Sequence, residues 1–577
     1  MKISIAKTAG FCMGVHRAVE MALDAANDGS GPIYTFGPLI HNPQVLKLLR
    51  EKGIRVLDEI PESGEGTVLI RAHGVPPDKR KQLEAAGFSI IDATCPRVIK
   101  VQAIIEKHAR EGCACIIVGD RDHPEVVGLL GYAGKKAHVV GRMHELDSLP
   151  NFDKAIVVAQ TTQNTLLFDA VKKWAENHHP RYKVFNTICD STERRQAEAR
   201  RLADAVDAVV VVGGHESGNT QRLVEIVQQN GKPAYHIETE AELSMEVLKN
   251  IGHVGITAGA STPNWIIKRI YRFIESLPYR DDPSSLKRRI FSLQRFLLIT
   301  NIYLALGAGA LCYACTQLQA LRHMVPYIVI SVFYILSMHM LNHLTGIKEA
   351  RFNDPDRAVF YETNKILLTL MALISGALGL SIAAGLGMFP FVLLFIMSVL
   401  GLAYNMPLIP GFIRNVKHRR IRDIPGSKTI LIALAWAMVT TLFPVLAETG
   451  TIRFSTLPVV IWAGVIVFVR AAFFDVLDMQ GDRIVGKETI PILMGRDKAL
   501  ALLRAMLLIV FVILFLSSVF RVISGLGYVL LASPLKLFVV LVIHKRGYMM
   551  PGIRMEFLME SHLLLIGFVT LLWNFWH

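Results

Sequence analysis

The sequence predicts a chain of two unlike halves: an α/β half built from three parts with mostly parallel sheets, and an all-α membrane half of about nine transmembrane helices. Up to about residue 278, short β-branched runs alternate with amphipathic stretches, as in βα units around parallel sheets. Beyond residue 295, apolar segments of roughly 20 residues follow one another, each long enough to cross a bilayer. The composition agrees with a membrane half, because 52% of the 577 residues are hydrophobic and 19% are charged.

The strands of the first half are the clearest elements. We expect a first domain at residues 1–278, a basic linker at 279–295 and a membrane domain at 296–577. The best strand candidates are continuous apolar runs at Thr67–Arg71, Ala114–Gly119, Ala155–Ala159 and Ala208–Gly213. Helical patterns such as Val98–Glu111 and Arg194–Ala205 separate them, which predicts parallel pairing.

Basic residues set the expected topology of the second half. The nine spans lie near residues 296–316, 325–344, 366–387, 389–408, 427–447, 457–478, 499–520, 525–543 and 557–576. The linker and the loops after spans 2, 4, 6 and 8 contain KRR, KEAR, KHRRIR, DRIVGKE and HKR, whereas the other loops carry at most one arginine each. Because basic loops stay in the cytoplasm, we expect a multi-pass protein of the inner membrane with its first half in the cytoplasm.

The same topology accounts for much of the net charge. The chain carries +14 at pH 7, and a strongly basic chain can also indicate nucleic-acid binding. Here the basic residues lie between apolar segments, so we expect membrane lipid and no nucleic acid as partner. The N-terminus lacks the charged and apolar regions of a secretory signal, in agreement with a cytoplasmic first half.

Three cysteines share one local setting. Cys12, Cys95 and Cys189 each follow a strand-like run and precede a helical pattern. Backbone N–H groups and the helix dipole at a helix start stabilise a thiolate, so three such thiols could meet at the carboxyl ends of three strands. Three ligands would leave one metal position open, as catalytic sites do. The residues alone leave a second interpretation open, three unrelated buried thiols.

Polar side chains follow the other strand ends. They lie in the segments around His41, His73, His123, Glu125, Thr161, Ser217, Asn219 and Ser261. Parallel α/β sheets bind ligands outside the carboxyl ends of their strands, where helix starts and hydroxyls hold anions. The set suits a diphosphate, and a carboxyl beside an imidazole suits proton delivery.

The motifs together resemble a known family. The cysteine contexts GFCMGV, DATCPRV and TICDST, with HNPQV, RAHGVP, DHPEVVG, QTTQNT, SGNTQRL and TAGASTP, are similar to the IspH/LytB family of 4-hydroxy-3-methylbut-2-enyl diphosphate reductases. The resemblance covers about residues 1–278. It implies a pseudo-threefold fold around a central 4Fe–4S cluster, held by Cys12, Cys95 and Cys189, with one iron left without a protein ligand for the substrate hydroxyl.

The resemblance also implies a reaction and roles for residues. The reaction is two-electron reductive dehydroxylation to isopentenyl and dimethylallyl diphosphates, in the last step of the methylerythritol phosphate pathway, with a ferredoxin or flavodoxin as electron donor. Glu125 would supply the proton, with His123 assisting and Thr161 orienting the hydroxyl. The diphosphate would be bound by His41, His73, Ser217, Asn219 and Ser261. Gly218 is a departure, because a second serine often stands there in the family.

An acidic motif marks the membrane half. Asp475, Asp478 and Asp482 are spaced three and four residues apart, so one helical face carries all three carboxylates. Mg²⁺ with a bound diphosphate would neutralise this cluster. The alternative is a solvated cap at the end of the helix. Residues 290–577 resemble the UbiA-type intramembrane prenyltransferases. The resemblance rests on the nine spans, the segment around Tyr404, the segment RIRDIPGSKTILIALAWA and the acidic motif. In that family two Asp-rich motifs hold Mg²⁺ and a polyprenyl diphosphate.

The first Asp-rich motif departs from that family. At its expected place the sequence keeps Asn342 but replaces the aspartates, and we expect the nearby Asn353-Asp354-Pro355-Asp356 to supply carboxylates instead. Three interpretations follow for the whole chain. It is a reductase joined to a prenyltransferase, a reductase joined to an anchor or non-catalytic lipid-diphosphate binder, or a metal-binding sensor without turnover.

Overall fold

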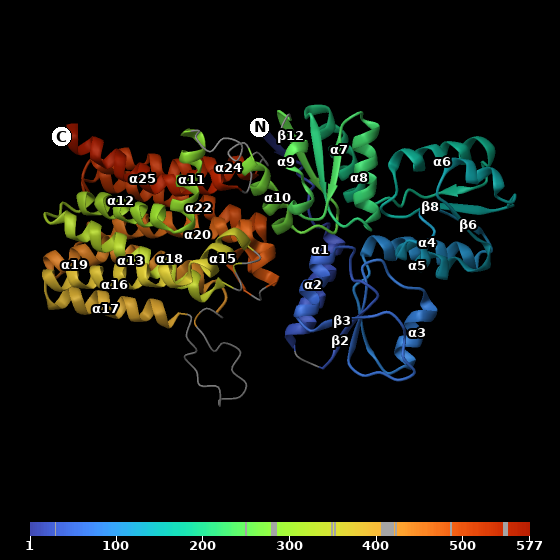
Figure 1. Ribbon diagram of the computed structural model, residues 1–577, viewed down its shortest axis with the longest axis horizontal. Helices are drawn as coiled ribbons and strands as arrows, with labels where there is room; N and C mark the ends of the chain where they lie inside the picture. Colours follow the sequence, from blue (N-terminus) through green and yellow to red (C-terminus); the bar gives the residue numbers. More distant parts are fainter. Residues whose placement is uncertain are drawn as a thin grey trace. The chain divides into compact units, whose positions relative to one another are not determined.

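The computed structural model divides into two compact units, residues 1–278 and 279–577 (Figure 1). It describes all of the chain except residues 29–30, 249–250, 278–285, 348–349, 351–352, 405–420, 422–423, 485–486, 546–551 and 577. The first unit is α/β and the second is helical, as the sequence predicted. Each unit has its own hydrophobic core.

The described residues of the first unit form three parallel four-stranded sheets. The first has the order β1 (Lys2–Ile5), β12 (His253–Ala258), β10 (Ala208–Val212), β11 (Ala234–Ile237). The second has the order β3 (Ile54–Leu57), β2 (Ile33–Phe36), β4 (Thr67–Ile70), β5 (Ser89–Asp92). The third has the order β7 (Ala137–Val140), β6 (Ala114–Val118), β8 (Ala155–Ala159), β9 (Lys183–Val184). Every pairing is parallel, which confirms the predicted three-part arrangement.

Helices cover these sheets and begin where strands end. The longer ones are α1 (Met13–Asp28), α2 (Pro43–Glu51), α3 (Pro77–Ala85), α4 (Pro96–Arg110), α5 (Pro124–Ala133), α6 (Thr165–His178), α7 (Asp190–Ala205), α8 (Gly218–Gln229) and α10 (Asn264–Ser276). Strands β6, β8 and β10 are buried along their whole length, as their continuous apolar runs require. In all three parts, helices therefore begin close to the carboxyl ends of the strands.

Proline fixes several of these helix starts. Pro43, Pro77, Pro96 and Pro124 occupy the first positions of α2 to α5. Proline suits the first turn because its ring sets φ and its missing N–H is not needed there. As a result the residue before it, for example Cys95, is held in the extended cap position.

The second unit is a bundle of apolar helices. They are α11 (Leu286–Ile299), α12 (Ile302–Leu318), α13 (Met324–Thr345), α15 (Pro355–Thr363), α16 (Lys365–Leu386), α17 (Met388–Ala403), α18 (Ser427–Ala437), η6 (Met438–Leu442), α19 (Phe443–Thr449), α20 (Thr456–Ile484), α21 (Ile490–Met494), α22 (Arg496–Val519), α23 (Leu526–Leu530), α24 (Ala532–Lys545) and α25 (Ile553–Trp576). In the described part of the chain, seven helices have the length and apolarity to cross a membrane, α11 and α12 pass the same test only when taken together as one bent pair, and α17 is a shorter apolar helix. This agrees with about nine predicted segments.

The ends of the predicted spans differ from the helices in two places. The first predicted span, 296–316, is divided between α11 and α12, which meet at an angle of 72°. The expected linker, 279–295, is described from residue 286 onward, where it already forms α11. The loops KEAR and KHRRIR lie almost entirely outside the described residues, as do residues 405–408 of the fourth predicted span.

Candidate functional site

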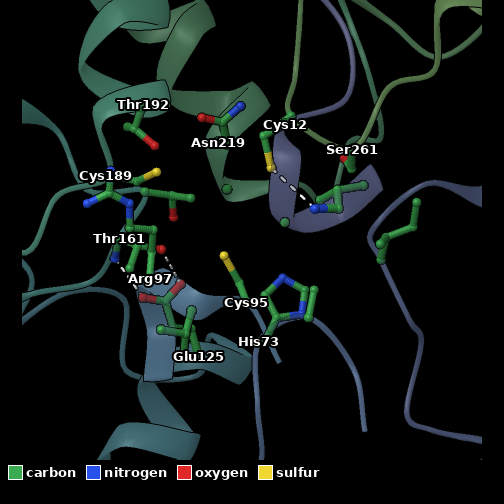
Figure 2. Close-up of a pocket in the computed structure, with 18 of the residues that line it drawn as sticks. Cys12, His73, Cys95, Arg97, Glu125, Thr161, Cys189, Thr192, Asn219 and Ser261 are labelled. Atoms are coloured by element: carbon green, nitrogen blue, oxygen red, sulfur yellow. Dashed lines mark hydrogen bonds between the residues drawn. The ribbon is translucent and has the colours of Figure 1, made fainter. Parts of the chain in front are cut away.

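The polar residues that follow the strands of the first unit line one pocket. It is lined by every residue of the predicted reductase site: Cys12, His41, His73, Cys95, His123, Glu125, Thr161, Cys189, Ser217, Asn219 and Ser261. Most of them are labelled in Figure 2. These residues come from all three sheets. The segments are far apart in the sequence, so the pocket exists only in the folded unit.

The three cysteines stand at three helix starts. Cys95 and Cys189 are the residues that directly precede α4 and α7, and Cys12 precedes α1. Figure 2 shows their sulfurs pointing into the same space. Gly14, in the first turn of α1, allows this approach, because a Cβ there would lie 2.5 Å from the Cys95 sulfur.

Burial makes bare thiolates unfavourable in this pocket. It raises the pKa of Cys12 and Cys95, although the backbone N–H of Val15, which donates to the Cys12 sulfur over 3.4 Å, acts in the opposite direction. At Cys12 and Cys95, burial therefore raises the thiol pKa by more than the backbone N–H groups at the helix starts lower it. The thiolates of Cys12 and Cys95 therefore need a positive counter-charge, and the iron of an iron–sulfur cluster would supply one.

A buried guanidinium lies beside the same thiols. Arg195 is 2% exposed, and the charges of Cys12 and Cys189 are among those that act on it. Burial lowers its pKa to about 10, so it remains charged at neutral pH. Its two terminal nitrogens donate to the carbonyl oxygens of Ala258, over 2.6 Å, and Gly10, over 2.9 Å.

Glu125 is buried next to the cysteines. Its carboxylate accepts hydrogen bonds from the backbone N–H of Thr161, over 2.6 Å, and from the Thr161 hydroxyl, over 2.8 Å. Burial raises its pKa to about 7, even though both of these bonds favour the charged form. A carboxyl that titrates near neutrality can hold and release a proton at physiological pH.

Three histidines form a triangle on another wall of the pocket. The ring centres of His41, His73 and His123 are 5.1 to 5.9 Å apart. Burial lowers the pKa of all three, that of His123 to about 4, so the rings are neutral near pH 7. Neutral imidazoles donate one N–H each and add no desolvated charge.

Several buried polar atoms in this wall of the pocket have no hydrogen-bond partner among the described residues. They include His41 Nε2, His73 Nδ1 and Asn219 Nδ2. Buried polar groups are nearly always hydrogen-bonded, so these atoms point to a bound group that accepts hydrogen bonds. The Ser261 hydroxyl lies 3.4 Å from that of Ser217 and donates to the His41 carbonyl over 3.0 Å.

The histidine triangle also has the spacing of a metal site. The hydrogen bonding of His123 favours an anion instead. Its Nδ1 accepts from the backbone N–H of Glu125 over 3.1 Å, so in the neutral ring the proton is on Nε2. A protonated Nε2 donates to an anion and cannot bind a metal ion.

The acidic motif of the second unit faces the interior of its bundle. Asp475 and Asp482 of α20 are each 1% exposed, which excludes a solvated cap for these two residues. Lys428 Nζ lies 2.9 Å from Asp475, whose carboxylate also accepts from Thr429. Asn353 donates to Asp482 over 2.8 Å. Asp478, between them on the same helix, is partly buried.

The carboxylates of the loop before α15 lie in ion pairs. Asp354 caps α15 by accepting from the Arg357 N–H, and its carboxylate also lies 3.7 Å from the Arg357 guanidinium. Asp356 pairs with Arg295 of α11 over 3.4 Å. Both carboxylates therefore serve local ion pairs, and Asn353 is the residue that reaches the acidic helix. Their role as substitutes for the missing aspartates stays a prediction.

Comparison with known proteins assigns the first unit. Residues 3–275 match the LytB protein family. A 4-hydroxy-3-methylbut-2-enyl diphosphate reductase from Alkaliphilus oremlandii is 43% identical over 280 residues, which are the whole of that protein and 48% of this chain. The chain belongs to the LytB family. Its first unit is thus a reductase-family enzyme domain.

The second unit of this LytB-family protein has a different origin. Residues 301–550 match the UbiA prenyltransferase family, so the chain is a fusion and a multi-pass membrane protein. Among solved structures, the reductase from Plasmodium falciparum has 28% identity and a TM-score of 0.46, covering 49% of this chain and 89% of that one. A UbiA homolog from Archaeoglobus fulgidus bound to GPP and Mg²⁺ has 17% identity and a TM-score of 0.38, covering 48% and 98%.

Three further residues of the LytB-domain site were not predicted. Arg97 and Thr192 line the pocket, and Arg195 lies behind it. All three lie within the first two turns of the helices that follow Cys95 and Cys189. Their positions in the sequence could have identified them, because residues in the first turns of a helix lie near the cysteine that directly precedes that helix.

Proposed function

We propose that the LytB domain reduces 4-hydroxy-3-methylbut-2-enyl diphosphate to isopentenyl and dimethylallyl diphosphates. Two electrons and two protons are consumed, the carbon–oxygen bond of the terminal hydroxyl breaks, and water leaves. The observation that carries the proposal is the meeting of three cysteines, a proton-holding carboxyl and an anion-binding wall in one pocket. The curated relatives are 4-hydroxy-3-methylbut-2-enyl diphosphate reductases, which supports the choice of substrate.

The diphosphate is bound mainly by donors without a partner among the described residues. His41, His73 and Asn219 offer buried N–H groups and Ser217 offers its hydroxyl, while the Ser261 hydroxyl would turn from the His41 carbonyl to the diphosphate. The start of α8 adds free backbone N–H groups beside Ser217. Neutral donors suit this task, since each contributes a hydrogen bond without the cost of burying its own charge.

The proton comes from Glu125. Its pKa of about 7 keeps a large fraction protonated at neutral pH, and the Thr161 hydroxyl beside it is placed to orient the substrate hydroxyl. His123, linked to Glu125 through the backbone N–H, assists by donating its Nε2 proton to the substrate. Protonation of the hydroxyl makes water the leaving group, which lowers the barrier to breaking the carbon–oxygen bond.

Cys12, Cys95 and Cys189 are proposed to hold a 4Fe–4S cluster. The residues fit it: three thiols converge, burial of Cys12 and Cys95 disfavours their thiolates without a cation, and Gly14 leaves space beside the Cys95 sulfur. The cluster would supply electrons and an iron without a protein ligand that binds the substrate oxygen. An external one-electron carrier of the ferredoxin or flavodoxin type would reduce it.

For the UbiA domain we propose binding of a prenyl diphosphate with Mg²⁺ at Asp475, Asp478 and Asp482. Burial of the first and third carboxylates within the bundle favours a ligand site, and Lys428 supplies a counter-charge to Asp475. Transfer of the prenyl group would break its bond to the diphosphate and form a bond to an acceptor that loses a proton. The alternative is an anchor or non-catalytic lipid-diphosphate binder, which the departure in the first Asp-rich motif favours.

The decisive experiment for the first domain is anaerobic turnover by the full chain in lipid nanodiscs. Oxidation of a chemically reduced viologen would be followed with 4-hydroxy-3-methylbut-2-enyl diphosphate as substrate. Residues 1–280 should retain this activity, because curated relatives of that length are complete proteins. Cys12→Ser should lose iron and turnover together. Full turnover without iron would overturn the cluster, and no turnover with a complete cluster would favour the sensor.

For the second domain, Asp478→Asn should abolish prenyl transfer from a radiolabelled prenyl diphosphate by membranes that contain the full chain. Asp497→Asn, an exposed carboxylate at the start of α22, is the matched control. An unchanged rate in Asp478→Asn would separate the acidic helix from Mg²⁺ binding. Protease protection in sealed vesicles would test the proposed cytoplasmic side of the first domain.

A further inference from the structure

The bend between α11 and α12 is built into the fold. Asn301 has a left-handed backbone conformation with φ of 60°, and it is 4% exposed. Asparagine tolerates this conformation better than most residues. Its carbonyl begins α12 by accepting from the Ala305 N–H, and its side chain donates to the Tyr361 hydroxyl over 2.9 Å.

Two contacts hold α11 in its bent direction. Arg357 of α15 donates to the Leu298 carbonyl at the end of α11 over 3.2 Å, and Arg295 of α11 pairs with Asp356. The side chains of Phe291 and Leu298 are 7% and 5% exposed and pack in a cluster that includes Ile553 of α25. The orientation of α11 therefore depends on α15 and α25 as well as on Asn301.

The opposite face of α11 is apolar and exposed. Leu286, Ile290, Leu293 and Phe296 are 71%, 47%, 57% and 47% exposed. Their spacing of four, three and three residues places them on one side of the helix. Lys287 and Arg289 are exposed in the first turn of the same helix.

This combination fits the surface of a membrane. A straight helix from 286 to 318 would be about 50 Å long, well beyond a hydrocarbon core of about 30 Å. With α12 crossing the bilayer, the 72° bend turns α11 nearly parallel to the membrane plane. Its apolar face can then enter the acyl region, and long basic side chains can reach the headgroups.

We propose that α11 is an in-plane helix that binds anionic phospholipid headgroups. The charge decides the lipid class, because the exposed side chains of Lys287 and Arg289 lie at the start of α11 and complement acidic headgroups. Asn301 and Arg357 fix the C-terminal end of α11, and the packing of Phe291 holds the preceding turns, so the helix has one depth in the membrane. This inference depends on the membrane location of the second unit and not on either proposed activity.

The depth of α11 can be measured in the full chain. A genetically encoded fluorescent amino acid would be placed singly at Leu286, Ile290, Leu293 and Phe296, in nanodiscs containing lipids with quenchers at shallow or deep positions. An in-plane helix predicts the same shallow depth at all four positions. A steady change of depth from 286 to 296 would overturn the proposal, because it would make α11 part of a span.

The lipid class requires a second measurement. Retention of phosphatidylglycerol would be compared by native mass spectrometry for the unaltered chain and for Lys287→Gln with Arg289→Gln. We expect the double variant to lose affinity on the order of tenfold or more, and Arg453→Gln, in a loop expected on the other side, to retain it. Equal retention by both variants would overturn anionic-lipid binding, and equal melting temperatures would show that folding is unaffected.

Discussion

Glu125 and Thr161 are joined by two hydrogen bonds, one from the backbone N–H over 2.6 Å and one from the hydroxyl over 2.8 Å. The Thr161 carbonyl in turn accepts from the N–H of Cys189 over 2.9 Å. The proposed proton donor and one proposed cluster ligand therefore depend on the position of the same residue. A displacement of Thr161 would move both groups.

Replacing Glu125 with glutamine should leave the cluster intact and reduce turnover by about 10² to 10⁴-fold, because glutamine cannot donate the required proton. In the unaltered enzyme, the pKa of about 7 predicts a turnover rate that falls as the pH rises above 7. Rates at saturating substrate and reductant between pH 6 and 9 test this. A variant with a near-normal rate would remove Glu125 from its role.

Thermal unfolding gives an independent test of the same carboxyl. Burial raises its pKa in the folded state above the ordinary value of 4.5, so the folded state prefers the protonated form. Its stabilising effect is complete below about pH 4.5 and is lost as the pH rises through 7. Glu125→Gln, which resembles the neutral form, should therefore melt at a higher temperature than the unaltered protein at pH 8, and the difference should shrink toward pH 5.

Thr161→Val removes the side-chain hydrogen bond and keeps the backbone bond. Because the hydroxyl favours the charged carboxylate, its loss should raise the pKa of Glu125 further and move the fall in rate to higher pH. Thr161→Ser retains the hydroxyl and serves as the control. The informative measurement is the pH profile, since loss of substrate orientation alone would lower the rate without moving the profile.

Arg195→Met should disorganise the loop that carries Cys12. Two carbonyl oxygens, those of Gly10 and Ala258, lose their hydrogen bonds to a buried guanidinium. We expect a loss of about 3 kcal/mol in the free energy of unfolding and a lower iron content. Arg195→Lys retains the charge and should recover part of both. Unchanged stability and iron in the methionine variant would contradict this role.

Most of the fold and of the LytB-domain site was predictable from the sequence, for a physical reason. Buried parallel strands are continuous apolar runs, and the polar residues directly after them must meet at one edge. The bend at Asn301 was not predictable, because it depends on Tyr361, sixty residues away. The ion pairs of the carboxylates near Asn353 were not predictable for a similar reason, since Arg295 and Arg357 contact them only in the folded bundle.

Gly14→Ala tests the close approach of α1 to Cys95. The added Cβ would lie 2.5 Å from the Cys95 sulfur and 3.0 Å from its Cβ, so the thiol must move. Iron and acid-labile sulfide per chain should fall. Gly128→Ala is the matched control, because it is also helical and its Cβ would lie 3.6 Å from its nearest neighbour, an ordinary contact. Equal iron in the two variants would contradict the role of Gly14.

Gly218→Ser should improve substrate binding. A Cβ at this position would lie 3.6 Å from His123 and 3.7 Å from Asp120, so the side chain fits without displacing its neighbours. The hydroxyl would join Ser217 and Asn219 at the start of α8 and add one hydrogen bond to the diphosphate, which should lower KM by about fivefold and leave kcat unchanged. Gly218→Ala adds the carbon without the hydroxyl, so an equal KM in the two variants would exclude this hydrogen bond.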